Sequence, residues 1–519
     1  MFGGQTPFAI PRVFQQIPYF FAMKLTAFLL LSLTATSFAR PAAGNFNEAL
    51  GEKFQRQSSQ QPNNLPTSAP DSIHRWNRVA IDATGLDHTP PAPGENRAFG
   101  EQLGPGRSSR AMAIVHIAMF DAINATVGQY QSFTGVTSRA RAISSIAAIS
   151  QAAHDTLVSL FPAQAAAFDA DLAEDLSRVR SKQQKANGIN LGRRIAAALL
   201  ASRSDDGAEL AEEKVGIDYI PSDLPGRWRQ DPISLIPLAL GAHWGQCRPF
   251  ILESTTQFRA PAPPALDSAE YASAYEEAKN LGGDGIVTPT QRTEEQTVIG
   301  TFWAYDGTPS LCAPPRLYNE ITVHIADQTN LSPLELARLL ALVNVAMADT
   351  GMTTWESKYY YDFWRPITAI RESDPGTGPT GLGDGNDTTI GDPTFTPLGA
   401  PASNLTGPNF TPPFPSYPSG HGAFGGALFQ TIRRFYGTDD IAFTFVSDEF
   451  NGVTKDHDGN VRPYMARSFS NLSQAEEENG QSRIYLGIHW RFDKTEAIQQ
   501  GRRVADYVFD HAFLPVHGR

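Results

Sequence analysis

Helical periodicity runs through most of this chain and constrains its fold more than any other feature. Segment after segment is rich in alanine or places apolar residues at the i, i+3, i+4 spacing of one helix face. No stretch shows the sustained alternation that a large sheet needs. The predicted fold class is therefore mainly α, with helices over residues 108–125, 143–160, 164–180, 184–201, 268–280, 294–303, 332–350, 422–436 and 493–509.

Chain length allows one large domain or two closely packed ones. With 519 residues the chain can bury a sizeable core. Proline and glycine clusters, such as those in 261–264 and 374–413, separate the helical segments.

The first 71 residues differ from the rest. Met23 and Lys24 precede the apolar run 25–33, and small residues follow up to Ala39, which is the order of a secretory signal. We therefore expect residues 1–39 to be a signal or targeting segment, with Met23 as an alternative start, and the mature protein to be secreted. Residues 40–71 contain many Gln, Asn, Ser and Pro residues and few large apolar ones, which predicts a flexible leader.

Charge restricts the partners of the chain. The formal net charge is −12 and no long run of Lys or Arg occurs, so nucleic acid and anionic membrane surfaces would be repelled. Beyond the leader no apolar run approaches the roughly 18 to 20 residues of a membrane span, and we expect none. An anionic substrate would need a local basic pocket.

Only two cysteines occur, Cys247 and Cys312. In a secreted chain they could form a disulfide, or they could be isolated buried thiols. The sequence leaves both open.

A first polar motif combines Lys358 and Arg365 with several aromatic residues. Seven positions separate the two cations, which predicts that they share one face of a helix after two turns. Two cations on an apolar face are costly unless an anion meets them. The alternative is a helix whose long side chains extend to water.

A second motif, Pro418-Ser419-Gly420-His421, opens a predicted helix. Ser419 offers a hydroxyl, the Gly420 N–H can approach an anion without a side chain in the way, and His421 can exchange protons near neutral pH. The alternative is an N-cap serine beside a surface histidine.

A third motif supplies another cation, Arg483, and a second imidazole, His489. Asp493 follows His489 by one helical turn and is placed to accept its second ring N–H. A carboxylate-held histidine is a good nucleophile or metal ligand, although the pair could also be a structural hydrogen bond.

Taken together, Lys-x6-Arg-Pro, Pro-Ser-Gly-His and Ser-Arg-x5-His-x3-Asp resemble the signature of the superfamily that joins vanadium haloperoxidases to type 2 phosphatidic acid phosphatases and bacterial acid phosphatases. The interval between His421 and Ser482 is long for this pattern. We expect an inserted loop there that contains Asp456-His457-Asp458.

Within the superfamily, the chain resembles the fungal chloroperoxidase branch of the vanadium haloperoxidases. Trp355 and Phe414 match the aromatic pair on the halide side, and Pro412-Pro413-Phe414-Pro415 fits the same proteins. Asp306 is expected to pair with a cofactor-binding arginine. Two alternatives stay open: a secreted acid phosphatase that uses a phosphohistidine intermediate, and a non-catalytic oxyanion-binding protein.

The resemblance implies two packed helical bundles, residues 72–290 and 291–519, with a vanadate site in the C-terminal bundle. His489 would bond the vanadium, and the surrounding groups would be those of Lys358, Arg365, Ser419, Gly420 and Arg483. His421 would act as general base and Lys358 would polarise the peroxide, so that hydrogen peroxide oxidises chloride, bromide or iodide to hypohalous acid. The preferred halide, an organic acceptor and the oligomeric state are left open.

Overall fold

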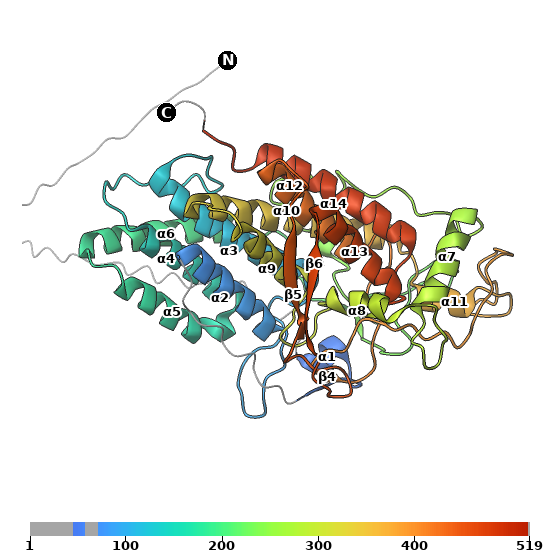
Figure 1. The fold of residues 1–519 in the computed structure, drawn as a ribbon. Helices are drawn as coiled ribbons and strands as arrows, with labels where there is room; N and C mark the ends of the chain where they lie inside the picture. The colour runs from blue at the N-terminus through green and yellow to red at the C-terminus, as the bar shows by residue number, and fades with distance from the viewer. Residues whose placement is uncertain (1–44, 58–70, 517–519) are drawn as a thin grey trace, which may run out of the picture. The chain divides into compact units, whose positions relative to one another are not determined.

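The computed structural model describes residues 45–57 and 71–516, and the predicted signal segment lies outside them. The described part is mainly helical, as predicted (Figure 1). The helices up to residue 290 are α1 (Phe46–Leu50), α2 (Ser72–Asp87), α3 (Gly104–Val127), α4 (Ser145–Leu160), α5 (Ala165–Ser177), α6 (Lys182–Ser202) and α7 (Ala269–Gly282), with short 3-10 turns at Pro162–Gln164 and Trp244–Gln246.

The later helices are α8 (Glu294–Phe302), α9 (Pro314–Ala326), α10 (Pro333–Tyr361), α11 (Pro366–Glu372), α12 (Gly420–Tyr436), α13 (Leu472–Tyr485) and α14 (Arg491–His511). The described strands form three two-stranded antiparallel pairs, β1 (Gln55–Arg56) with β4 (Leu405–Thr406), β2 (Glu213–Lys214) with β3 (Leu238–Ala239), and β5 (Phe443–Asn451) with β6 (Tyr464–Phe469).

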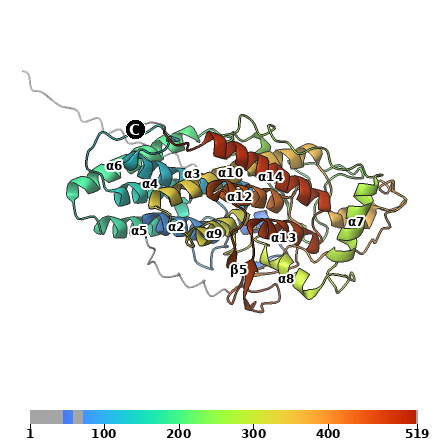
Figure 2. The same cartoon turned by 45° about the horizontal axis from the view of Figure 1, so that its top comes forward.

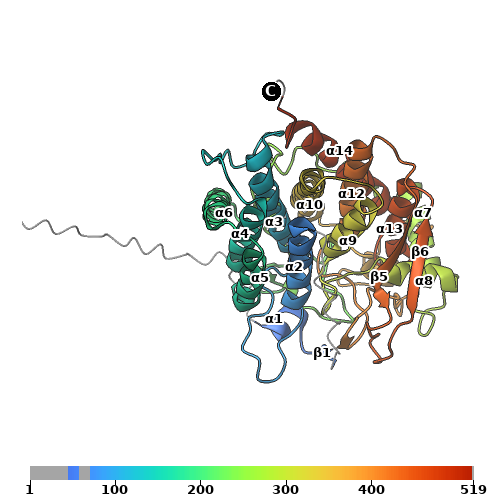
Figure 3. The same cartoon turned by 60° about the vertical axis from the view of Figure 1, so that its left-hand side comes forward.

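One group of helices is α2 to α6, which lie together on one side in Figure 3. Within it, α4 and α6 approach closely because glycines face the partner helix. A Cβ on Gly188 would lie 2.6 Å from the Ser144 carbonyl oxygen, and one on Gly192 would lie 2.5 Å from that of Ala148. Larger residues at these positions would push the two helices apart.

A second group contains α10, α12, α13 and α14, which Figure 2 shows side by side. Here Gly501 of α14 contacts α12, and an added Cβ would lie 2.0 Å from the Ala423 carbonyl oxygen. Helix α7 precedes the predicted boundary at residue 291 but packs against α11, α13 and α14 of this group.

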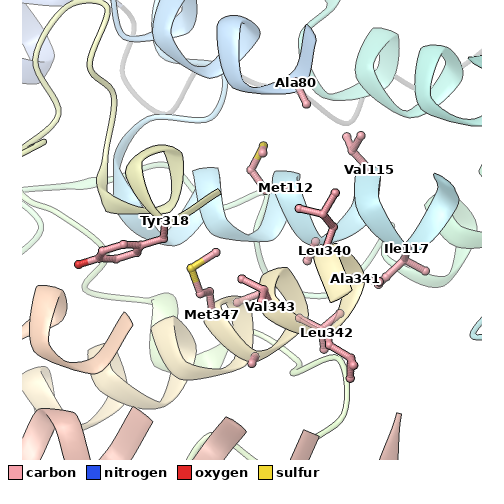
Figure 4. Packing of buried hydrophobic residues seen from close by; sticks show 14 of the residues in the cluster. Ala80, Met112, Val115, Ile117, Tyr318, Leu340, Ala341, Leu342, Val343 and Met347 are labelled. Atoms are coloured by element: carbon pink, nitrogen blue, oxygen red, sulfur yellow. The ribbon is translucent and has the colours of Figure 1, made fainter. Parts of the chain in front are cut away.

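The two groups share one hydrophobic core, in which α3 and α10 lie against each other. Figure 4 shows residues of this core, among them Met112 and Val115 of α3 and Leu340 and Val343 of α10. By length and hydropathy α3 could also cross a membrane, but 83% of its most apolar window is buried within the protein.

The flexible leader predicted for residues 40–71 is wrong for residues 45–57. Asn45 caps α1, and β1 pairs with β4. Phe54 is buried, and Phe46 and Leu50 pack against two of the hydrophobic clusters, so this segment buries enough apolar surface to become ordered.

The long interval after α12 holds a β-hairpin rather than a simple loop. Strands β5 and β6 pair antiparallel between α12 and α13, and Asp456-His457-Asp458 lies in their connection. Cys247 and Cys312 are both free and buried, so the disulfide alternative is not realised.

Candidate active site, a buried cationic cradle

The three sequence motifs converge at the ends of α10, α12 and α13. A cavity is lined there by His421, Arg483 and His489, together with Trp355 and Phe414. Further lining comes from Asp306 and Gly420. The remaining predicted site residues, Lys358, Arg365, Ser419 and Asp493, are buried and contact the same segments.

Lys358 and Arg365 do not share a helix face, so that prediction is wrong. Helix α10 ends at Tyr361, Asp362 follows with a φ of 52°, and Arg365 is the N-cap of α11. The residue before a proline avoids the helical region, and Pro366 follows Arg365, so the helix cannot continue to it.

The two cations are brought together by one loop segment, residues 414–416, instead. Lys358 Nζ donates to the carbonyl oxygens of Pro415 (2.9 Å) and Ser416 (2.8 Å). Arg365 Nε donates to the carbonyl oxygen of Phe414 at 2.9 Å. Burial, and then the charge of Arg365, lower the pKa of Lys358.

His489 is fixed in one tautomer by its two neighbours. Its Nε2 lies 2.9 Å from Arg365 Nη1, which can only donate, so Nε2 is the acceptor. Its Nδ1 therefore carries the proton and donates to Asp493 Oδ2 at 2.7 Å. Ser416 Oγ also donates to that carboxylate. The lone pair of Nε2 thus faces the cations, and burial followed by their charge lowers the pKa of His489, which keeps the ring neutral.

His421 is fixed in the opposite tautomer. Its Nε2 contacts the Ala304 carbonyl oxygen, which can only accept, so Nε2 carries the proton. Nδ1 is then left with its lone pair. Burial, and then the charge of Arg483, lower the pKa of His421. The ring is therefore neutral near physiological pH and can accept a proton at Nδ1.

Buried donors without acceptors surround the same place. Arg483 is 1% exposed as a side chain, and its Nη2 donates to both carboxylate oxygens of Asp306, at 2.6 and 2.8 Å. Among the described residues no partner is present for Arg483 Nε, Arg483 Nη1 or Arg365 Nη2. Each such group costs about 1 to 3 kcal/mol when left unsatisfied, so the arrangement favours an oxyanion with several acceptor oxygens.

The start of α12 adds backbone donors. Ser419 is the N-cap and its Oγ accepts from Gly422 N at 3.3 Å. The first N–H groups of a helix have no acceptor within it. A Cβ on Gly420 would lie 3.1 Å from the Trp355 indole, so glycine leaves the approach to these groups clear.

Trp355 and Phe414 form the aromatic side of the cavity. Their ring centroids lie 4.9 Å apart, and Lys358 Nζ lies 5.6 and 5.1 Å from the two centroids. The Trp355 indole is held by a hydrogen bond to the Leu240 carbonyl oxygen at 3.0 Å. These ring faces stabilise the buried ammonium by cation–π attraction and keep water away from it.

Sequence reasoning missed the β5–β6 hairpin as a support for the site. Ser447 Oγ donates to the Phe302 carbonyl oxygen, and Asp448 N–H donates to Tyr305 Oη, both at 2.7 Å. Segment 302–306 also carries the two groups described above that contact His421 and Arg483. The length of the insertion was the only available signal.

Sequence reasoning also missed Ser416. It directly follows Pro412-Pro413-Phe414-Pro415, the segment that resembles the fungal enzymes. Its Oγ contacts Asp493 and its carbonyl oxygen contacts Lys358.

Comparisons with known proteins show what the chain is similar to. A family model described as the second helical-bundle domain of VCPO matches residues 338–518. The vanadium chloroperoxidase of Curvularia inaequalis is 31% identical over 506 residues, covering 81% of this chain and 79% of that protein.

Two solved structures share the fold. A bacterial vanadium-dependent iodoperoxidase gives a TM-score of 0.66 at 22% identity, covering 86% of this chain and 98% of its own. An apo-type bacterial vanadium-dependent chloroperoxidase gives a TM-score of 0.59 at 16% identity, covering 79% of this chain and 94% of its own. Since the Curvularia relative is matched over about four fifths of each chain, and the motif residues converge on one buried cationic cradle, the chain belongs to the vanadium haloperoxidases, as an enzyme of the chloroperoxidase-like type.

Proposed function

We propose that the cationic cradle binds vanadate and that the chain uses hydrogen peroxide there to oxidise chloride, bromide and iodide to hypohalous acid. The observation that carries this is the set of unpartnered guanidinium N–H groups of Arg365 and Arg483 beside the lone pair of His489 Nε2. A tetrahedral oxyanion supplies acceptors for these donors, and its metal accepts the imidazole lone pair.

The charges of the cradle fit an anion. Lys358, Arg365 and Arg483 are buried, and two buried carboxylates, Asp306 and Asp493, face them. The cations exceed the carboxylates by one, so an anion offsets the remaining positive charge. Lys358 uses two of its three N–H donors on carbonyl oxygens, which leaves one for a ligand.

Each residue then has a separate task in holding vanadate. His489 Nε2 bonds the metal, while Asp493 holds the ring in the required tautomer. Arg365 and Arg483 donate to its oxygens, and the Ser419 hydroxyl and the Gly420 N–H complete the cradle. When bound, the vanadate supplies a Lewis acid that activates peroxide without a change in oxidation state.

His421 is the proposed general base. Its Nδ1 takes a proton from hydrogen peroxide entering through the cavity, while the Nε2–H bond to Ala304 keeps the ring in place. Positioned general bases contribute about 10² to 10⁴ in rate. Lys358 donates its remaining N–H toward the reacting oxygen, and the low-dielectric walls of Trp355 and Phe414 strengthen that donation.

Trp355 and Phe414 are also the proposed halide pocket. A halide beside these rings lies next to the Lys358 ammonium and has shed part of its water. The apolar ring of Phe414 cannot exchange protons with His421, which suits chloride as the halide hardest to oxidise.

We also propose that the chain is secreted. The apolar run 25–33 after Met23 and Lys24, with small residues up to Ala39, supports an N-terminal signal. N-terminal sequencing of protein recovered from culture medium should start near Arg40. Recovery only from cell extract with residues 1–39 intact would contradict this.

The catalytic proposal is tested with vanadate-free protein. Halogenation of monochlorodimedone in the presence of peroxide and bromide should appear on addition of orthovanadate, and phosphate should inhibit by competing for the cradle. A parallel assay with p-nitrophenyl phosphate tests the phosphatase alternative. Fast phosphate release without halogenation would overturn the proposal.

A further inference from the structure

A group of unpaired basic residues lies on this otherwise acidic chain. The formal net charge is −12, yet residues 128–154 and 176–204 contain no Asp or Glu. Seven exposed or half-buried cations of these two stretches have no ion pair, hydrogen bond or ring contact within the described part of the chain. We call them the basic surface: Arg139, Arg141, Arg180, Lys182, Lys185, Arg193 and Arg194. Among the described residues, Arg503 is the one further Lys or Arg without such a partner.

The fold brings the two stretches together. Ser144 N–H donates to the Gln184 carbonyl oxygen at 3.1 Å, and the Asn187 side chain donates to the Ala142 carbonyl oxygen at 2.7 Å. The loop 138–144 therefore lies beside the first turns of α6. Its cations join those of α6 on one surface, away from the cradle at the ends of α10, α12 and α13.

Helix α6 holds its cations outside the core. It packs on α4 through Gly188 and Gly192, and Figure 3 shows it on the outer side of α4. Lys182 and Arg193 are eleven positions apart, about three turns, so they share a face and lie about 16 Å apart along the axis. The basic surface is therefore elongated, which suits a linear polyanion.

The side chains between the cations indicate which polyanion fits. Residues 138–144 and 178–194 contain no Phe, Tyr or Trp, whereas proteins that bind single-stranded nucleic acid combine basic residues with aromatic rings that stack on bases. Gln184 and Asn190 are exposed, and their side chains have no hydrogen bond to the described residues. Such amides can donate to and accept from sugar hydroxyls.

We propose that the basic surface binds a linear acidic polysaccharide, whose uronic acid carboxylates pair with these cations. Guanidinium groups match carboxylates through paired hydrogen bonds. Anionic lipid is concentrated in the cytoplasmic leaflet, which a secreted protein does not meet. The choice of a polysaccharide thus rests on the proposed secretion, and it is independent of the catalytic proposal.

Polygalacturonate is the probe, at about pH 6, where its carboxyl groups are ionised. Anisotropy of the labelled polymer at about 50 mM salt should give a dissociation constant on the order of 10 µM. Affinity should fall at least about tenfold when the salt is raised to about 200 mM, because exposed charges are screened and bound counterions are no longer released. Dextran, which is uncharged, should not bind.

The triple variant Arg141→Gln/Lys182→Gln/Arg193→Gln removes three exposed cations of the basic surface. It should weaken polygalacturonate binding at least about tenfold, since each cation near a charged surface contributes about a tenfold or smaller factor. Halogenation by the vanadate-loaded variant should stay unchanged, because none of the three residues lies in the cradle. Its melting temperature shows whether it folds.

The matched control is Lys214→Gln/Arg491→Gln/Arg503→Gln, which changes the net charge by the same amount at surface positions of β2 and α14. It should keep most of the affinity. Failure of the wild type to bind polygalacturonate at about 50 mM salt, or equal weakening in the two triple variants, overturns the proposal.

Other partners are distinguished in the same assay. Tighter binding of a single-stranded oligonucleotide, or of phosphatidylserine vesicles, than of polygalacturonate overturns the choice of a polysaccharide. Sedimentation at low salt tests the acidic surface of a second copy as the partner. Self-association that is lost only in the basic-surface variant would assign the surface to that contact instead.

Discussion

Replacing Asp306 by asparagine should destabilise the vanadate-free protein and increase the stabilisation that vanadate gives. Asp306 and Arg483 are both almost fully buried and joined at 2.6 and 2.8 Å. Breaking a buried pair typically costs about 3 to 5 kcal/mol. Asp306→Asn keeps an acceptor oxygen, so we expect a loss at the lower end of this range. The free energy of unfolding of the vanadate-free protein should fall by about 3 kcal/mol.

The same substitution should strengthen the attraction of the cradle for an anion. It raises the excess of buried positive charge by one. At roughly 6 Å and an effective dielectric constant of about 20, one charge contributes about 3 kcal/mol. For a chain of this size the unfolding entropy is large, so a change of 1 kcal/mol in the free energy of unfolding shifts Tm by about 1 °C. The apo Tm should therefore fall by about 3 °C, and the rise on adding vanadate should be about 3 °C larger than in the wild type.

Thermal unfolding with and without orthovanadate measures both quantities. Asp349→Asn is the matched control, because Asp349 is a buried carboxylate outside the cradle that accepts from three backbone N–H groups, those of residues 250 to 252. It should lower the apo Tm and leave the vanadate-induced rise unchanged. An unchanged apo Tm in Asp306→Asn, or a smaller vanadate-induced rise, would refute the charge argument.

Three further outcomes follow from the site and the core. Phe414→His should lower the steady-state rate of chlorination about tenfold or more relative to that of bromination, because a polar ring then stands between Lys358 and Arg365. Equal losses of both rates would count against the halide pocket. Tyr305→Phe should lower kcat about tenfold with vanadium content unchanged, because Asp448 N–H loses its acceptor. Tyr464 is exposed, so Tyr464→Phe should leave kcat unchanged. Burial lowers the pKa of His116 to about 4, so the apo protein should lose up to about 3 kcal/mol as pH falls from about 6.5 toward 4, where only the unfolded chain binds this proton. His116→Gln should flatten that part of the pH profile of Tm, and an unchanged profile would contradict the assignment.

Much of the helical fold could be predicted because its signal is local. Alanine-rich and apolar periodic segments, such as those of α4 and α6, specify a helix and its buried face together. Helix α13 was missed because it is polar. Its buried Glu476 is stabilised by Arg433 and Arg502, which come from α12 and α14, and no local pattern reveals such ion pairs.

The site residues could be predicted but their arrangement could not. Motif spacing identified the cations and both histidines, yet Lys358 and Arg365 meet through the carbonyl groups of residues 414–416 rather than through a helix. That contact depends on a tertiary approach of distant segments. Likewise, Leu50 lines the cavity only because α1 packs beneath distant apolar residues.

The most direct test of the account compares vanadium retention in two histidine variants. After loading with orthovanadate and gel filtration, the wild type should keep about one vanadium per chain. His489→Ala should lose it, because the only proposed bond from the protein to the metal is gone. His421→Ala should keep the metal and halogenate about 10² to 10⁴ times more slowly. Equal loss of vanadium from both variants, or full retention in His489→Ala, would contradict the assigned roles.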